Sequence, residues 1–376
     1  MGTPNRRDVM KGLSAGAALG ALGLGSRRAQ AAVAASDRRF LFVVNQGGWD
    51  PTTVFAPLFG LSTVDMEPDA QPMTIGGLTL VDSAARPSVR AFFERWHDRA
   101  VVLNGVSVRS LSHDICTMVS LTGNSSGLAP DWATHVAGAR RADFTLPHLV
   151  LGGPSFAGDL GAAVARSGAS GQLDGLLRGD LFDASDLEAP LPSPAAEQVL
   201  DRWMRRRAAA ALDGATRPEE VVLSADLAES LDRGVQLKER RHDLSFDPGP
   251  SLATQGPAAI DALARGIARC VTISEAVSWD THANNAQQSA LFESLFGRLA
   301  SIVERLESTP GTTGGTLLDE TVVVVLSEMG RTPKLNASQG RDHWPYTSML
   351  VLGPGLTGSR VVGGFDARYN GVEIDP

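Results

Sequence analysis

The sequence predicts an α/β protein built on a mostly parallel central sheet. Several runs of apolar and β-branched residues show no polar alternation, which is typical of strands covered on both faces. These runs cover residues 40–44, 100–103, 149–151, 322–326 and 348–352. Helical patterns lie between them, and the clearest spans residues 289–307, where apolar residues recur every four positions. This alternation of strands and helices predicts a layered α/β architecture.

The first 31 residues have the pattern of an export signal. The twin arginine Arg6-Arg7 precedes an apolar run from Gly12 to Gly25 and the small residues that end at Ala31. A run of about 14 residues is too short to span a bilayer, so we expect no transmembrane span in the mature chain. We expect cleavage after Ala31, the twin-arginine (Tat) export machinery as a partner, and a periplasmic or secreted protein.

Charge and cysteine content exclude some classes of protein. The whole chain has a formal net charge of -8, and removal of residues 1–31 takes away five basic residues and one acidic residue, which leaves -12. An acidic protein lacks the basic face that nucleic acid requires, so we expect no nucleic-acid partner. Two cysteines, Cys116 and Cys270, are too few for a disulfide framework.

The remaining residues, 32–376, have the length and apolar content of one large α/β domain. Within it, residues 154–250 differ in character. They contain a stretch rich in Gly and Asp at 158–186 and charged helical patterns at 197–212 and 218–241. We interpret this segment as a cap insertion over the sheet and not as a separate domain.

Carboxylates and imidazoles lie beside three of the expected strands and after a further apolar stretch, Cys270 to Val277. The six groups are Asp50, Asp280, His282, Glu328, Asp342 and His343. Because the carboxyl ends of parallel strands meet at one edge of a sheet, we expect these side chains to converge. Their oxygen and nitrogen atoms are ligands for a divalent metal, whether Zn, Mg, Ca or Mn. The sequence therefore predicts a metal site without identifying the metal.

Several of the candidate residues have a competing structural interpretation. Asp50 follows a glycine turn, and turn statistics alone favour a turn or helix-cap role by about two to one. Arg331 is equally compatible with an ion pair to Glu328 and with a clamp on an anionic substrate. Ser112 and His113 open an expected helix, whose N-terminus stabilises anions, but Ser112 is equally suitable as an N-cap.

Five segments together resemble a known family. They are Gly47-Gly48-Trp49-Asp50, Ser112-His113, Trp279-Asp280-Thr281-His282, Ser327-Glu328-Met329-Gly330-Arg331-Thr332-Pro333 and Arg341-Asp342-His343. The family is domain of unknown function 1501, a group of exported bacterial proteins related to alkaline phosphatases and sulfatases. The resemblance covers nearly all of residues 32–376. It implies an alkaline-phosphatase-like three-layer sandwich with a mostly parallel central sheet and an inserted helical and loop cap.

The resemblance also implies roles for individual residues. The implied metal ligands are Asp50, Asp280, His282, Glu328 and His343, which leaves Asp342 as a supporting residue. In such enzymes one or two metals hold the ester while a Ser, Thr or formylglycine attacks it. In such enzymes the nucleophile lies ten residues before a glycine, and the corresponding glycine here looks like Gly123. Counting back ten residues from Gly123 gives His113 and not Ser112. Either Ser112 or His113 is therefore expected to be the nucleophile, or His113 a ligand.

These features predict an exported metal-dependent hydrolase of small-molecule or polymeric phosphate or sulfate esters, with Arg331 as the anion clamp. Met329 stands where relatives carry a second ligand, which favours an alternative. In this alternative, a catalytically impaired protein keeps the fold and binds a glycan, an anionic polymer or an envelope partner. The resemblance further implies relatives that continue beyond Pro376, so we expect this chain to be shorter than they are.

Overall fold

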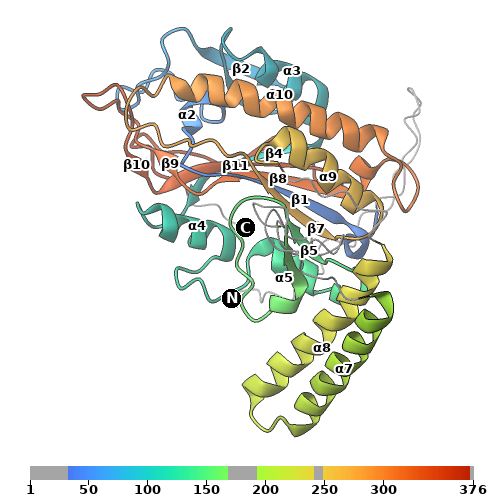
Figure 1. The fold of residues 1–376 in the computed structure, drawn as a ribbon. Helices are drawn as coiled ribbons and strands as arrows, with labels where there is room; N and C mark the ends of the chain where they lie inside the picture. Colours follow the sequence, from blue (N-terminus) through green and yellow to red (C-terminus); the bar gives the residue numbers. More distant parts are fainter. Residues whose placement is uncertain (1–32, 168–192, 241–248, 373–376) are drawn as a thin grey trace, which may run out of the picture. The chain divides into compact units, whose positions relative to one another are not determined.

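An eight-stranded sheet forms the centre of the fold in the computed structural model, which describes residues 33–167, 193–240 and 249–372. The strand order is β12-β4-β11-β8-β1-β7-β5-β6 (Figure 1). The strands are β1 (Arg39–Asn45), β4 (Ala100–Ser107), β5 (His148–Val150), β6 (Val164–Arg166), β7 (Cys270–Ser274), β8 (Thr321–Ser327), β11 (Tyr346–Leu352) and β12 (Arg360–Gly363). Only β11 is antiparallel to its neighbours. The predicted α/β class with a mostly parallel sheet is confirmed.

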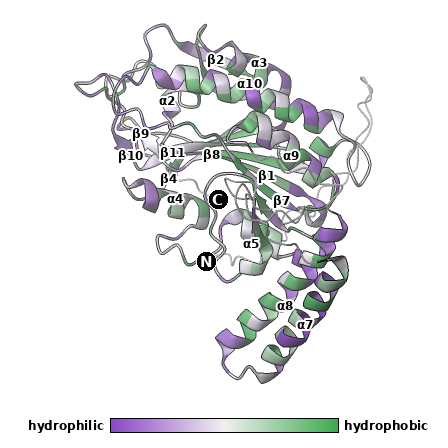
Figure 2. Ribbon diagram, viewed as in Figure 1, coloured by the Kyte–Doolittle hydropathy of each residue, from purple (hydrophilic) through white to green (hydrophobic). Residues whose placement is uncertain are grey.

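Helices cover both faces of this sheet (Figure 1). One face carries α3 (Pro87–Trp96), α9 (Leu252–Ala264) and α10 (Gln287–Ser308), and the other carries α4 (His113–Thr122) and α5 (Trp132–Gly138). Successive residues of β1 pack into different cores, because Leu41 belongs to the cluster with α9 and α10 and Phe42 to the cluster with α5. Figure 2 shows the resulting hydrophobic strands between the two helical layers. Burial on both sides explains why these strands are continuously apolar.

The direction of β11 brings a further loop to the edge of the sheet at which the parallel strands end. The carboxyl ends of β1, β7 and β8 lie at one edge because these strands are parallel. β4 runs the same way, and β11 lies antiparallel between β4 and β8. The loop that precedes β11 therefore meets the loops that follow β1, β4, β7 and β8, at the edge where α/β sheets bind ligands. We call this edge the functional edge.

Aromatic packing fixes two of these loops. Trp49, after β1, is fully buried and stacks on Phe292 of α10 with 5.6 Å between ring centroids. Trp279, after β7, meets Trp49 edge-on at 6.1 Å. The indole N–H of Trp49 donates to Thr347 Oγ1 of β11 at 3.0 Å. These contacts give the polar residues beside both tryptophans defined positions.

The segment predicted as a cap contributes two different features. Its residues Val164–Arg166 form β6, an edge strand of the central sheet. Helices α7 (Pro194–Gly214) and α8 (Pro218–Glu239) form a pair that is linked to the body through an ion pair of 3.3 Å between Arg141 and Glu229. Residues 168–192 and 241–248 of this segment, like the predicted export signal, lie outside the described residues.

Shorter elements complete the described chain. They are α2 (Pro51–Val54), the hairpin β2 (Gln71–Ile75) and β3 (Leu78–Asp82), the pair β9 (Gly330–Arg331) and β10 (His343–Trp344), and the 3-10 turns Ala35–Asp37, His97–Arg99, Arg141–Asp143, Gly161–Ala163 and Leu317–Asp319. Cys116 and Cys270 are both buried and free. Over the ranges that the structure describes, no helix has the length and apolar character to cross a membrane.

His148 makes the stability of this fold depend on pH. The residue is fully buried in β5 between the hydroxyls of Thr134 and Thr272, each 2.8 Å away. Burial lowers its pKa from 6.5 to about 4. Between these values the unfolded chain binds a proton that the folded chain does not bind. We therefore expect the free energy of unfolding to fall by about 3 kcal/mol as the pH drops through this window.

Urea denaturation at pH 7 and pH 4.5 measures this loss. His148→Gln is expected to reduce the pH dependence, because the variant has no imidazole at this position to be protonated in the unfolded state. The exposed His135→Gln serves as the control and is expected to behave like the unchanged chain. The same pH dependence in all three proteins would contradict the role of His148.

Candidate metal centre

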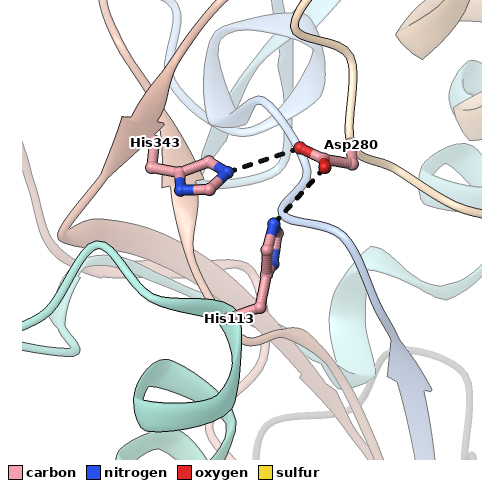
Figure 3. A group of neighbouring side chains, drawn as sticks. All are labelled: His113, Asp280 and His343. Carbon is pink, nitrogen blue, oxygen red and sulfur yellow. Dashed lines mark hydrogen bonds and ion pairs between the residues drawn. The ribbon is translucent and has the colours of Figure 1, made fainter.

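Side chains from the loops at the functional edge meet in one cluster (Figure 3). His113 opens α4 after β4, Asp280 and His282 follow β7, and His343 lies in β10 directly before β11. Ligand atoms of His113, Asp280 and His343 all lie within 4.8 Å of one another. We call His113, Asp280, His282 and His343 the histidine–aspartate cluster.

Asp280 is the centre of the histidine–aspartate cluster. Its Oδ1 lies 3.1 Å from His282 Nε2 and 3.4 Å from His343 Nε2. Its Oδ2 lies 3.5 Å from His113 Nε2. The Nε2 atoms of His282 and His343 are 2.9 Å apart. One carboxylate and three imidazoles thus direct oxygen and nitrogen atoms toward a small common volume.

The second nitrogen of each histidine is held by an oxygen acceptor. The three Nδ1 contacts are His113 to Glu328 Oε1 at 2.7 Å, His282 to Asp342 Oδ1 at 3.0 Å, and His343 to the carbonyl oxygen of Leu111 at 2.6 Å. A carbonyl only accepts, and the hydrogen bond from His282 lowers the pKa of the Asp342 carboxyl, so that group also accepts. These partners place the ring proton on Nδ1 and leave the Nε2 lone pairs for the cluster.

This tautomer pattern calls for a cation inside the cluster. The lone pairs of His282 Nε2 and His343 Nε2 would face each other across 2.9 Å, beside the Asp280 carboxylate. The arrangement is repulsive unless one imidazole gains a second proton or a metal ion lies between the nitrogens. His113 Nε2 is buried without a hydrogen-bond partner, so it offers a further nitrogen toward the same volume.

Neighbouring charges set the ionisation of the cluster. The hydrogen bond to Glu328 raises the pKa of His113, an effect that partial burial opposes. Burial tends to raise the pKa of Asp280, but the hydrogen bond and charge of Arg331 outweigh it, and the net pKa is lowered. Asp280 is therefore ionised at neutral pH and suited to a cation.

Arg331 connects the loops that carry the cluster. Its side chain is fully buried, and one guanidinium nitrogen lies 2.6 Å from Asp280 Oδ1. The same side chain also donates to the backbone carbonyls of Gly47, Gly48, Trp279 and Arg341. Its ion pair is thus with Asp280 and not with Glu328. The structure favours the ion-pair interpretation, because a buried guanidinium is not presented to a substrate.

Glu328 supports the cluster from outside. Its carboxylate is buried and accepts hydrogen bonds from the Gly47 N–H at 2.8 Å and the Ser327 hydroxyl at 3.1 Å, in addition to His113 Nδ1. Three donors occupy the carboxylate that was expected to be a ligand. The structure thus places Glu328 where it orients His113, as carboxylates behind metal-binding histidines do.

Asp50 lies outside the histidine–aspartate cluster. Its side chain caps α2 by accepting the Thr52 N–H at 3.0 Å. It also accepts Asn285 Nδ2 at 2.8 Å and lies 3.3 Å from Arg341 Nε. Within the described residues, none of its hydrogen bonds or ion pairs reaches the cluster. The structure therefore places Asp50 in the helix-cap role that turn statistics favour.

Of the neighbours Ser112 and His113, His113 is the one that joins the cluster. Ser112 is exposed, and its side chain does not cap α4. No hydrogen bond between described residues links the Ser112 hydroxyl to the cluster. Met329 is fully buried, and its side chain packs with Val108 and Cys116 in a small core.

Two glycines allow the loops to come this close. Gly47 has φ +111°, and a Cβ at this position would lie 2.5 Å from the backbone nitrogen of Trp279. A Cβ on Gly340 would lie 2.0 Å from the carbonyl oxygen of His282. Only glycine permits these approaches, so the loops after β1 and before β11 can both pack against the loop that carries Asp280.

The cluster opens into a cavity of about 440 Å³. His113 and Asp280 line it together with Asp114, Glu275 and Glu328. No arginine or lysine lies among the described residues of this wall. The wall is acidic, so an anionic substrate would need the charge of a bound cation to enter.

Comparison with known proteins identifies the family. Residues 186–373 match the family described as protein of unknown function (DUF1501), which is half of the 376-residue chain. The chain belongs to the DUF1501 family. The matched region of this DUF1501 protein contains Asp280, His282 and His343, whereas His113 precedes it. A search of curated proteins gave no match.

Two supporting groups of this DUF1501 protein were not predicted from the sequence. One is the carbonyl oxygen of Leu111, which holds His343. The other is Gln288 of α10, whose Nε2 donates to the Trp279 carbonyl at 2.9 Å and whose Oε1 accepts the Asp50 N–H at 3.0 Å. Any residue has a backbone carbonyl, and a single glutamine in a helix carries no pattern, so no signal in the sequence identified them.

Replacement of Arg331 by Met is expected to lower the free energy of unfolding by about 3–5 kcal/mol. The reason is that Asp280 and four carbonyl oxygens lose a buried cationic donor. Urea denaturation measures the change. The exposed Arg360→Met is the matched control, with an expected change within about 0.5 kcal/mol. Similar losses in both variants would show that Arg331 does not hold the loops.

Proposed function

We propose that this DUF1501 protein is an exported, metal-dependent hydrolase of phosphate or sulfate esters with an alkaline-phosphatase-like fold. The support for the fold is the sheet with helices on both faces and the convergence of polar loops at its functional edge. The support for export is the twin arginine at Arg6-Arg7 followed by the apolar run Gly12 to Gly25.

The facing lone pairs in the histidine–aspartate cluster carry the proposal. His282 Nε2 and His343 Nε2 approach to 2.9 Å while their Nδ1 atoms are occupied by Asp342 and Leu111. Imidazoles oriented through Nδ1 by carboxylate or carbonyl oxygens are characteristic of metal ligands. An ion held by His113, Asp280 and His343, with His282 at its side, would remove the repulsion.

The donor set favours zinc among Zn, Mg, Ca and Mn. Magnesium and calcium prefer sets made of oxygen, whereas imidazole nitrogens with one carboxylate suit zinc. Glu328 and Asp342 stand behind His113 and His282 and strengthen the imidazoles as ligands. Arg331 keeps the Asp280 carboxylate ionised and fixed.

The residues around the cluster suit hydrolysis assisted by a metal. Such an ion supplies Lewis acidity toward the oxygens of an ester. The cavity of about 440 Å³ gives the cluster access to a small molecule or to a segment of a polymeric anionic ester. The buried Arg331 leaves anion binding to the metal, and the exposed Ser112, which makes no hydrogen bond to the cluster in the described structure, leaves the protein nucleophile unassigned.

A second candidate is a non-catalytic member that uses the same fold for binding. Two observations favour it, namely the burial of Arg331 and the packing of Met329 against Val108 and Cys116. The first leaves the Arg331 guanidinium unable to bind a substrate anion. The second leaves a buried thioether where the resemblance implies a second metal ligand. Such a protein would bind metal through the histidine–aspartate cluster but would not turn over an ester.

Metal content tests the centre. The chain expressed without residues 1–31 is expected to bind about one zinc per molecule, and Asp280→Asn is expected to weaken zinc binding more than about 100-fold, since even outer residues contribute 10–100-fold. Asp50→Asn is the discriminating variant, because the structure places Asp50 away from the cluster, and its zinc content is expected to persist. Elemental analysis and competition with a chelator measure both. Equal zinc loss in the two variants would support the role of Asp50 as a ligand and contradict this centre.

Turnover distinguishes the two candidate functions. With zinc bound, hydrolysis of p-nitrophenyl phosphate or p-nitrophenyl sulfate is expected to fall more than about 100-fold in His113→Gln, which loses a ligand. Ser112→Ala is expected to keep kcat within about twofold, because its hydroxyl does not reach the cluster. Loss of activity in Ser112→Ala would identify a serine nucleophile. Stoichiometric zinc without turnover of either ester would favour the non-catalytic candidate.

A further inference from the structure

A second cavity lies beside the helix cap of α2. Its volume is about 400 Å³, which is within the range of small-molecule sites, roughly 300–1,000 Å³. Asp50, Asn284, Gln339 and Arg341 are on its wall. In the described structure, none of the four residues of the histidine–aspartate cluster lines it. We call it the Arg341 cavity.

Arg341 contributes a buried guanidinium to this wall. The side chain is 3% exposed, and its Nη1 and Nη2 donate to the carbonyls of Thr332 and Asp65. Its Nε lies 3.3 Å from Asp50 Oδ2 but makes no hydrogen bond. The Nε is covered and has the Asp50 carboxylate beside it, so Arg341 contributes a buried charge to the wall and not an open hydrogen-bonding position.

Two exposed residues with left-handed backbones line the same space. Asn284 and Gln339 have φ values of +54° and +57°, a left-handed conformation that asparagine adopts readily but that costs energy for Gln339. Their loops are fastened together, because the Asn285 N–H donates to the Gln339 carbonyl at 2.7 Å and the Asn284 N–H to the Ser338 carbonyl at 3.1 Å. Neither side-chain amide has a hydrogen-bond partner among the described residues. Strain retained at a pocket wall is typical of ligand-binding positions.

The charges on the wall already neutralise one another. Three carboxylates line the Arg341 cavity, and each has a cationic partner within 3.3 Å. The pairs are Asp50 with Arg341, Asp65 with Lys334, and Glu67 with Arg86. The carboxylates oppose an anion, and the arginine opposes a cation. The wall therefore suits an uncharged ligand.

The remaining wall determines the class of this uncharged ligand. The amides of Asn284 and Gln339 both donate and accept, which suits hydroxyl groups that do the same. Met66, Pro68 and Leu335 add an apolar side, against which the C–H face of a ring can pack. We propose that the Arg341 cavity is a second binding site, separate from the metal centre, and that it takes a neutral sugar ring. This assignment does not depend on hydrolysis at the cluster.

Binding is tested with the full chain and neutral sugars. The probes are D-glucose, D-galactose and D-mannose with the uncharged trisaccharides maltotriose, cellotriose and mannotriose, examined by ligand-observed NMR and calorimetry. At least one is expected to bind with a Kd of about 1 mM or tighter. Sodium sulfate and spermidine are expected not to compete. A trisaccharide that binds at least tenfold tighter than its hexose would identify a polymer as the source of the ring, and equal affinity would identify a free sugar.

Variants locate the binding. Asn284→Gly and Gln339→Gly remove one amide each and relieve the left-handed strain, so both are expected to fold, to retain zinc and to bind the sugar at least tenfold more weakly. Arg109→Gly is the matched control, since Arg109 is another left-handed residue, φ +55°, and is not on this wall. Its affinity is expected to match that of the unchanged chain.

The exposed Ala286→Trp tests the same site by filling the cavity, and it is expected to abolish binding even if a glycine variant fails to fold. The proposal is overturned if no probe binds more tightly than about 10 mM. It is also overturned if a sugar binds the unchanged chain and the folded variants equally. Because zinc content and ester turnover are measured separately, failure of the sugar site is distinct from failure of the metal centre.

Discussion

The buried guanidinium of Arg331 is the interaction on which the functional edge depends. A charge without solvent is tolerated only when it is paired and hydrogen-bonded. Arg331 meets this requirement with Asp280 and with carbonyls of three separate loops. Each loop is irregular and would leave polar backbone groups buried by itself. Their common partner therefore makes the loops after β1 and β7 and the loop before β11 one structural unit, and the position of Asp280 follows from it.

The sequence was informative about the fold where burial alone determines the pattern. β1 and β8 lie at the centre of the sheet, are covered on both faces, and were predicted from their unbroken apolar runs. The direction of β11 was not predictable, because an apolar run is the same in either direction and its orientation depends on pairing with β4 and β8. The three-residue strand β6 was missed inside the predicted cap, since so short an edge strand carries no periodicity.

The site was predictable as a location more than as a list of ligands. Strand ends indicated the edge at which Asp280 and His282 lie, since the direction of a parallel strand fixes that edge, whereas His343 reaches it through the antiparallel pairing of β11. The direction in which a side chain points depends on its neighbours in space, and the sequence alone does not show which residues these are. Thr52 and Arg341 draw Asp50 into a helix cap, and the Gly47 N–H and Ser327 hydroxyl hold Glu328 behind His113. A family resemblance transfers residue types, but it does not transfer these local hydrogen bonds.

The proposed metal centre and the proposed sugar site share the loops that form them. Residues 280–285 carry Asp280 to the wall of one cavity and Asn284 to the wall of the other. Residues 339–343 carry His343 into the histidine–aspartate cluster and Arg341 to the wall of the Arg341 cavity. The Arg341 N–H donates to the Thr281 carbonyl, and its own carbonyl accepts from Arg331, which holds Asp280. A ligand that reorients Arg341 therefore acts on the same backbone that positions Asp280. Since coupling between two sites is reciprocal, metal binding would alter sugar affinity by the factor with which sugar alters metal affinity.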